Sequence, residues 1–300
     1  MTQERGYHQG ELAVQRQAGV RREADELVGM LAPPVPSPGR AKFLAERAFA
    51  VITARDDAGR LWTTPLFGGP GFLEQDGEKL RVHVLPAGPL QHLPADQPVG
   101  MITIDLATRR RLRVNGQVLE TGPDGFTVLV EASFGNCPQY IQGREVLADV
   151  SSGSAGGTSP ADAAQVARLV AAADTFFLGT VHPTRGADAS HKGGQPGFLR
   201  ADADGLWWPD YRGNNMFNSL GNITVDPSTA LFVPDFAGGR ALYLSGTAQL
   251  EWYEPFEPGV MMDEGMTGRR VRFHPEQALI GPMPLQATEP DPSPALPRIR

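Results

Sequence analysis

The 300-residue sequence contains a single cysteine, Cys137, so no disulfide can form within the chain. So few cysteines are typical of a reducing compartment, and the first residues lack the apolar stretch of a signal peptide. No apolar run approaches the roughly 18 residues that would span a bilayer. We therefore expect a soluble, cytoplasmic protein that does not associate with membranes.

Basic side chains are also in deficit, with 27 Lys and Arg against 34 Asp and Glu and a formal net charge of −7. Such a surface repels phosphate polymers, so nucleic-acid binding is not expected, although a local basic pocket for one small anion is compatible with it. The six histidines show no metal-ligand spacing, which predicts no metal site. Without GxGxxG, P-loop or GxSxG motifs, nucleotide binding by a Rossmann unit and hydrolysis by a nucleophile elbow have no support.

Glycine and proline are abundant, at 35 and 27 residues, or about a fifth of the chain. Residues of this kind do not fit inside long helices, so many short strands joined by turns are predicted. Strand-like runs extend from Phe49 to about Ala132, with turn signals such as those at 57–59 between them, and resume from Thr175 to about Leu250. The hydrophobic fraction of 41% is enough for a sizeable core.

Composition divides the chain into five segments: an N-terminal helical segment (1–40), a first β domain (41–150), a linker (151–160), a second β domain (161–283) and a Pro-rich tail (284–300). Apolar periodicity predicts one helix over 11–31 in the first segment. Ser159 and Pro160 are expected to cap and begin a second helix. The tail is expected to be extended or loosely ordered.

The two β domains resemble each other in sequence. Gly69–Leu73 lies over Gln195–Leu199 at an offset of 126 residues, and Leu112–Gly116 lies over Leu242–Gly246 at an offset of 130. Turn dipeptides recur in any β protein, but ordered matches with so small a drift are better explained by duplication. We therefore predict a duplicated β domain.

The copies differ most between Ser190 and Ile223, where the second is dense in hydrogen-bond donors and aromatics and the first is not. Trp207 and Trp208 end a predicted strand and offer flat surfaces there. Because adjacent strand residues face opposite sides, we expect at most one of the two to face a cofactor.

This segment also has the features of a phosphate site. A helix is predicted over about 214–221, and Gly213 allows the tight turn before it. Free N–H groups at a helix N-terminus, beside Lys192 and Arg212, favour a bound phosphate. Neutral donors are supplied by Asn214, Asn215 and Ser219. A phosphate pocket beside aromatics suits a phosphorylated planar cofactor, although such side chains also occur as solvated charges and turn braces.

The run Trp208–Ile223, WPDYRGNNMFNSLGNI, resembles a motif of the pyridoxamine 5'-phosphate oxidase-like family, whose fold is the FMN-binding split β-barrel. Segments 190–192 and 133–141 resemble parts of an uncharacterised branch of that family. The resemblance covers roughly 49–251. It departs from true pyridoxamine phosphate oxidases, because their Arg-Lys phosphate pair aligns with Asn214-Asn215 and their C-terminal substrate segment has no counterpart here.

The resemblance implies a mainly β chain with flanking helices, a tandem duplicated split β-barrel that forms an intrachain pseudo-dimer. Such barrels are usually homodimers with flavin in the interface, so one FMN per chain is implied, with the first half as the partner wall. The resemblance leaves open whether two such chains pair further as a homodimer. The implied cofactor-binding residues are Ser190, His191, Lys192, Trp208, Asp210, Tyr211, Arg212, Gly213, Asn214, Asn215, Asn218 and Ser219, with Arg111 and Arg113 reaching across on one face of a first-half strand.

An FMN-dependent oxidoreductase acting on a small molecule with a separate electron donor is the implied function, since flavin itself performs the electron or hydride chemistry. No side chain need act as a nucleophile. Cys137, next to Pro138 and without a CxxC motif or activating base, is interpreted as part of a structural corner. The alternatives that stay open are a non-catalytic flavin- or haem-binding sensor on the same fold, F420 in place of FMN, and a cofactor-free interaction protein.

Overall fold

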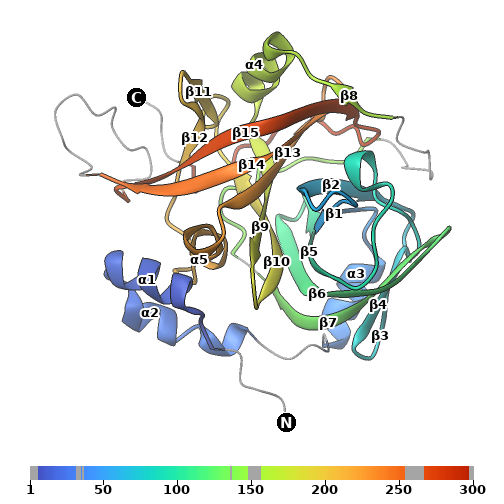
Figure 1. The fold of residues 1–300 in the computed structure, drawn as a ribbon. Helices are drawn as coiled ribbons and strands as arrows, with labels where there is room; N and C mark the ends of the chain where they lie inside the picture. The colour runs from blue at the N-terminus through green and yellow to red at the C-terminus, as the bar shows by residue number, and fades with distance from the viewer. Residues whose placement is uncertain are drawn as a thin grey trace.

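The computed structural model describes residues 6–31, 35, 37–135, 137–147, 157–253 and 267–296. Two antiparallel sheets dominate these residues, and the helices at their margins are short (Figure 1). In the described part of the chain, no helix is both long and apolar enough to cross a membrane.

Short helices form the N-terminal segment: α1 (Gln9–Gln17), α2 (Arg21–Asp25), the 3-10 turn η1 (Val28–Met30) and α3 (Pro38–Ala45). The single helix predicted over 11–31 is therefore wrong. Gly19 follows the C-cap of α1 with a φ of +70°, a conformation that glycine adopts readily and that ends a helix.

Seven strands form the first sheet: β1 (Phe49–Arg55), β2 (Leu61–Phe67), β3 (Leu73–Asp76), β4 (Lys79–Val82), β5 (Gln97–Asp105), β6 (Arg110–Gly122) and β7 (Gly125–Gly135). They pair in the order β2-β1-β5-β6-β7-β4-β3, and the 3-10 turn η2 (Gly88–Leu90) lies between β4 and β5. Strand β2 (LWTTPLF) is buried along its whole length, and its residues accordingly show no alternation between apolar and charged side chains.

The second sheet repeats this design with β9 (Thr175–His182), β10 (Gly186–Gly193), β11 (Arg200–Asp202), β12 (Gly205–Pro209), β13 (Ser228–Asp235), β14 (Arg240–Trp252) and β15 (Arg269–Pro282). Its strand order, β10-β9-β13-β14-β15-β12-β11, is that of the first sheet shifted by one repeat. Helix α4 (Ala163–Ala172) precedes it, and α5 (Asn218–Val225) connects β12 to β13.

Strand register confirms the duplication more strictly than the strand order does. Residue pairs of the first sheet recur in the second at the sequence offsets given above. Phe49 pairs with Phe67 in the first sheet, and the corresponding Thr175 pairs with Gly193 in the second. In the same way, the pair Gly100 and Asn115 corresponds to the pair Ala230 and Ser245. Both long hairpins also carry a bulge at the same place, after Asn115 in β6 and after Ser245 in β14. A bulge shared at one register position is an inherited feature of a repeated domain.

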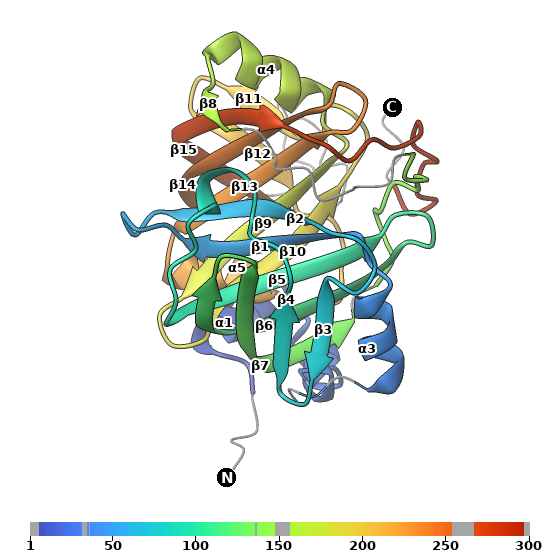
Figure 2. The same cartoon turned by 90° about the vertical axis from the view of Figure 1, so that its right-hand side faces the viewer.

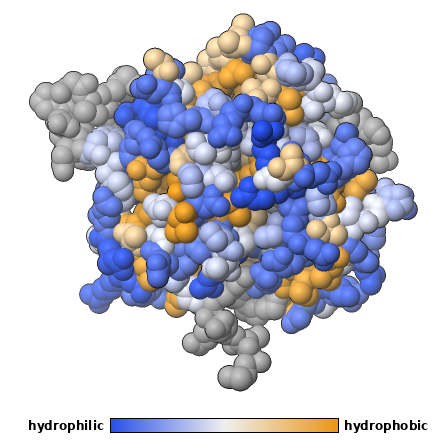
Figure 3. All heavy atoms as spheres, in the orientation of Figure 1, coloured by the Kyte–Doolittle hydropathy of each residue, from blue (hydrophilic) through white to orange (hydrophobic). Residues whose placement is uncertain are grey.

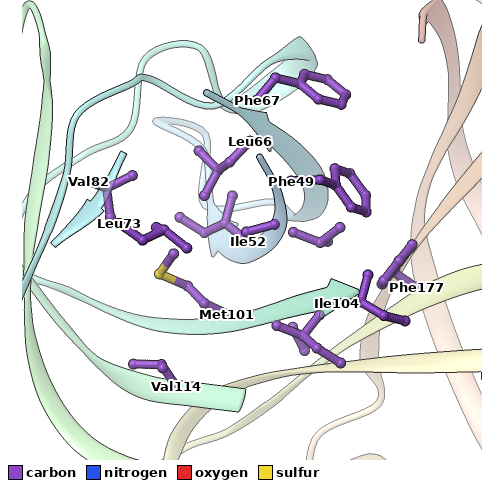
Figure 4. Close-up of a cluster of buried hydrophobic side chains, with 14 of the residues drawn as sticks. Phe49, Ile52, Leu66, Phe67, Leu73, Val82, Met101, Ile104, Val114 and Phe177 are labelled. Carbon is purple, nitrogen blue, oxygen red and sulfur yellow. The ribbon is translucent and has the colours of Figure 1, made fainter. Parts of the chain in front are cut away.

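The two halves pack face to face in a reciprocal way. Strand β10 lies against β5 and β6, and its counterpart β2 lies against β13 and β14 (Figure 2). Phe49 meets Phe177 of the other half edge-on at 5.7 Å, so one apolar core continues across the junction (Figure 4). The chain is thus mainly β with flanking helices, a tandem duplicated split β-barrel forming an intrachain pseudo-dimer, as predicted.

Two local predictions are corrected around this core. Ser159–Pro160 forms β8, which pairs with β15, and α4 is capped instead by Asp162, whose side chain accepts a hydrogen bond from the Gln165 N–H. In the described part of the tail, residues 284–296, Leu285 is fully buried, so this part packs against the protein rather than being loosely ordered. Most of the predicted linker, residues 151–156, lies outside the described residues.

Polar side chains cover most of the face shown in Figure 3, and apolar atoms appear between them in scattered patches. Single exposed apolar residues are ordinary on a folded protein and mark no site by themselves.

Candidate functional site

A cavity lies at the junction of the two halves, and most of the predicted residues line it. The twelve that do are Arg111, Arg113, His191, Lys192, Trp208, Asp210, Tyr211, Gly213, Asn214, Asn215, Asn218 and Ser219. The second half contributes β10, the end of β12, the segment that follows it and the start of α5. The first half contributes β6 and residues just beyond β7, so neither half forms the cavity alone.

Two predicted residues lie outside the lining. Ser190 is buried behind the lining, where its Oγ lies 3.1 Å from the Ser219 Oγ. Arg212 is exposed, and its backbone carbonyl accepts a hydrogen bond from the Tyr140 hydroxyl at 2.7 Å. The Arg212 side chain is therefore not part of the cavity lining.

Helix α5 begins at Asn218, not near 214 as predicted, which moves the free N–H groups of its first turn by one helical turn. Asn215 and Phe217 have φ values of +59° and +58°, a left-handed conformation that cannot continue as helix. Between them Met216 is fully buried, and its carbonyl accepts a hydrogen bond from Gln15 Nε2 at 3.2 Å. Because Met216 is anchored in the core, the helix begins only after it, at Asn218.

Arg111 is a cavity-lining cation without a carboxylate partner. Its Nη1 lies 3.2 Å from His191 Nδ1, and its Nη2 donates to the Cys137 carbonyl at 2.7 Å. No Asp or Glu oxygen of the described residues lies within 4.0 Å of it, and its Nε has no hydrogen-bond partner. Desolvation and, after it, repulsion from the nearby Arg113 charge lower the pKa of Arg111 to about 9. The charge of Arg111 is therefore uncompensated within this wall.

Arg113, on the same face of β6, is compensated. Its Nη1 lies 3.0 Å from Asp188 Oδ2, and both side chains are buried. Asp188 also accepts hydrogen bonds from Asn115 Nδ2 at 3.2 Å and from the Ser219 hydroxyl at 3.1 Å. Asp188 thus joins β6 of one half to β10 and α5 of the other.

The remaining charged lining groups come from the second half. Lys192 Nζ lies 3.8 Å from Asp210 Oδ1, and Asp210 Oδ2 also accepts from Arg269 Nε at 3.0 Å. Burial lowers the pKa of Lys192. Burial and, after it, the positive charge of Arg111 lower the pKa of His191 well below its usual range, so the imidazole is neutral.

Among the described residues, two buried ring nitrogens of the lining have no hydrogen-bond partner: His191 Nε2 and Trp208 Nε1. Indole nitrogen is only a donor, and burial of an unmatched donor costs about 1–3 kcal/mol. The adjacent Trp207 faces away and stacks against Arg200 and Arg270, with guanidinium carbons 4.7 and 5.3 Å from its ring, as expected for alternate strand faces. Donors left unmatched in a cavity favour a ligand with acceptor atoms.

Sequence reasoning missed the first-half residues Cys137, Gln139 and Tyr140, which also line the cavity. Cys137 is exposed and free. Tyr140 has a left-handed φ of +65°, and its ring lies 5.0 Å from that of Tyr211, so one tyrosine from each half lies at the cavity. The only signal for this segment was its resemblance to the family at 133–141.

The segment carrying Tyr140 passes so close to β10 that only glycine fits at position 193. A Cβ at Gly193 would lie 1.9 Å from the Tyr140 carbonyl oxygen. We expect Gly193→Ala to lower the free energy of unfolding by about 1–3 kcal/mol and to displace Tyr140 from the cavity. Gly213→Ala is the matched control, because Gly213 also lines the cavity but has no atom within 4 Å of such a Cβ. Urea unfolding measures the difference, and equal stability of the two variants would contradict the close approach.

The pseudo-symmetric counterpart of this cavity is filled with apolar side chains. By the register offsets, the positions of Lys192, Arg111 and Arg113 are occupied there by Leu66, Ala241 and Tyr243. All three replacements are fully buried in the core that spans the halves. Charged groups therefore surround only one of the two pseudo-equivalent positions.

No model of a known protein family matches the chain, and no curated protein matches its sequence. Similar solved structures include a Lactobacillus delbrueckii protein described as a pyridoxamine 5'-phosphate oxidase, with 18% identity and a TM-score of 0.30 over 40% of this chain and 93% of that one. A Mesorhizobium loti protein described as FAD-binding has 11% identity and a TM-score of 0.31, covering 44% and 98%. The haem storage protein HutZ from Vibrio cholerae has 12% identity and a TM-score of 0.31, covering 40% and 94%. The family expected from the sequence is thus represented among the structural neighbours.

Proposed function

We propose that the cavity binds FMN and that the protein is an FMN-dependent oxidoreductase acting on a small molecule, with a separate electron donor. The observation that carries this proposal is Arg111, a cation that faces the cavity and has no carboxylate within 4.0 Å among the described residues. An anionic ligand would supply the missing counter-charge. The buried Trp208 Nε1, which has no partner, adds a donor for an acceptor atom of that ligand.

The lining fits a molecule with an anionic end and a flat body. Arg111, Lys192 and the first N–H groups of α5, that of Ser219 included, would hold the phosphate, because these cationic and amide donors line the same cavity. Trp208 and the pair of Tyr140 and Tyr211 provide flat surfaces for a ring. When bound, FMN supplies the electron- or hydride-transfer chemistry, and these side chains bind it, orient it and limit its contact with water.

One cofactor per chain is part of the proposal, because the second pseudo-equivalent position is filled by Leu66, Ala241 and Tyr243. A homodimer of whole chains would then carry two cofactors, each bound between the halves of a single chain.

A second candidate is a non-catalytic protein that binds flavin or haem. For haem, the buried His191 Nε2 would be the iron-binding nitrogen, since neutral imidazole is a common haem-iron ligand; its proton would then have to move to Nδ1, which faces Arg111 Nη1 at 3.2 Å. Among the described residues, no group of three or more His, Cys, Asp or Glu side chains is arranged so that it could hold a metal ion.

Titration of the purified protein with FMN, followed by flavin fluorescence and visible absorption, tests both candidates. We expect saturation at one FMN per chain, and then reduction by NADH or NADPH and reoxidation by an added acceptor. A stoichiometry near two would contradict the single cavity. A Soret band on addition of haem, without FMN binding, would favour the haem-binding alternative over the proposed one.

A further inference from the structure

The N-terminal helix α1 packs directly on α5, the helix whose first turn borders the cavity. Figure 1 shows the two lying side by side although they are about 200 residues apart in sequence. The contact is made by two glycines, because a Cβ at Gly10 would lie 2.1 Å from the Gly221 carbonyl oxygen and one at Gly221 would lie 2.6 Å from the Glu11 nitrogen. This close approach brings the Glu11 side chain to the start of α5.

Glu11 is an acidic side chain buried at that contact, with an exposed fraction of 4%. Its Oε2 accepts from the His8 N–H at 2.8 Å, and its Oε1 accepts from Asn218 Nδ2. Among the described residues, no Lys or Arg nitrogen lies within 4.0 Å of it. The charged and titratable groups that face it are Tyr7, His8 and His182 beside α1, Arg185 in the turn before β10, and Asp188 on β10.

Asn218 connects Glu11 to the ligand cavity, because it lines that cavity and also a smaller one that Glu11 itself lines. A carboxylate can only accept hydrogen bonds, so it holds the amide with its NH₂ toward Glu11. A protonated carboxyl group can instead donate to the amide oxygen. The amide could then turn, which would bring both N–H groups of Asn218 to the cavity side.

We propose that Glu11 is a positioning residue that links proton uptake to ligand binding, because its carboxylate holds one N–H of Asn218, whereas its protonated form releases both N–H groups for an anionic ligand. This inference rests on the proposed binding of FMN in the cavity. On this inference the N-terminal helix contributes to ligand binding. The affinity of the cavity for an anion then depends on Glu11, which does not contact the anion.

The electrostatics of the neighbourhood agree with such a link. Burial raises the pKa of Glu11 to about 7, whereas burial and His182 lower that of His8 to about 4. Burial also lowers the pKa of His182. Around neutral pH, Glu11 therefore changes charge while both histidines stay neutral. Reciprocity then requires that bound anion favours protonated Glu11, so binding takes up a proton and weakens as the pH rises through 7.

The test is the dissociation constant of FMN from pH 6.0 to 8.5 in three proteins: wild type, Glu11→Gln and Glu23→Gln. Glutamine is uncharged and can donate to Asn218 at every pH. We expect wild type to bind FMN within twofold of Glu11→Gln at pH 6.0 and about fivefold or more weakly at pH 8.5. Glu23 is exposed on α2, so Glu23→Gln makes the same chemical change away from the contact and should follow wild type. The FMN phosphate titrates near pH 6, but identically with all three proteins.

Calorimetry at pH 7.5 in two buffers of different ionisation enthalpy measures the number of protons taken up when FMN binds. A purely structural role of Glu11 would leave this number unchanged. We expect net proton uptake on FMN binding by wild type, and less by Glu11→Gln. In an Asn218→Ala background, the Glu11→Gln change should no longer alter the pH profile. Parallel pH profiles of wild type and Glu11→Gln would overturn the inference and leave the proposed function standing. Failure of FMN to bind at any pH would overturn the proposed function and the inference with it.

Discussion

Replacement of Asp188 by alanine is expected to lower the free energy of unfolding by about 3–5 kcal/mol, because it leaves the Arg113 charge buried without its partner. The ion pair measures 3.0 Å, and the two side chains are only 10% and 4% exposed. Asp188 also accepts from Asn115 and Ser219, so those donors lose their acceptor as well. Denaturant unfolding followed by circular dichroism gives the value.

Asp76→Ala is the matched control for this prediction. Asp76 pairs with Arg81 at 2.9 Å, but both side chains are about half exposed, so the loss should not exceed about 1 kcal/mol. The double variant Asp188→Leu with Arg113→Met should recover most of the lost stability, because it removes both buried charges together. A loss from Asp188→Ala no larger than that from Asp76→Ala would show that the buried ion pair does not hold the halves together.

Replacement of Arg111 by methionine is expected to weaken FMN binding by about 10- to 100-fold, the effect of losing one or more charge-assisted hydrogen bonds worth about 1.5–3 kcal/mol. Without FMN the same change should leave the melting temperature equal or raise it, because it removes a desolvated cation that has no counter-ion in this wall. Opposite effects on binding and stability distinguish a ligand-binding arginine from one that supports the fold.

Arg110→Met is the control for Arg111→Met. Arg110 precedes Arg111 on β6 and faces the other side of the sheet, where it is exposed and stacks over Phe43 at 5.0 Å. The Arg110→Met protein should bind FMN like wild type. Fluorescence titration measures both affinities, and thermal unfolding of the cofactor-free proteins measures both stabilities. If Arg111→Met bound FMN as tightly as Arg110→Met, the anion-binding role of Arg111 would be wrong.

The duplication could be predicted from sequence because it rests on local patterns. The offset of 126 residues between matching segments reappears in the pairing of Phe49 with Phe67 and of Thr175 with Gly193. The offset of 130 reappears between the Gly100–Asn115 and Ala230–Ser245 pairs. Strand pairing with one buried face fixes register to the residue, so a repeated sequence repeats its register.

The lining of the cavity could be predicted only in part. Residues 191–219 form most of one wall because they follow one another along the chain, and strand alternation placed Arg111 and Arg113 on one face. The start of α5 was misplaced, because burial of Met216 in the core decides where the helix begins. Helix propensity is a weak preference that such tertiary contacts override.

What the sequence determined by itself is the repeated β architecture and the unequal chemistry of its two copies, since both follow from the order of residues along each strand and turn. The tertiary structure alone decided that Tyr140 reaches across to Tyr211, that Arg111 has no carboxylate beside it, and that Glu11 meets Asn218. Each of these depends on the packing of segments far apart in the chain, up to 207 residues for Glu11 and Asn218, and such separations leave no periodic trace in a single sequence.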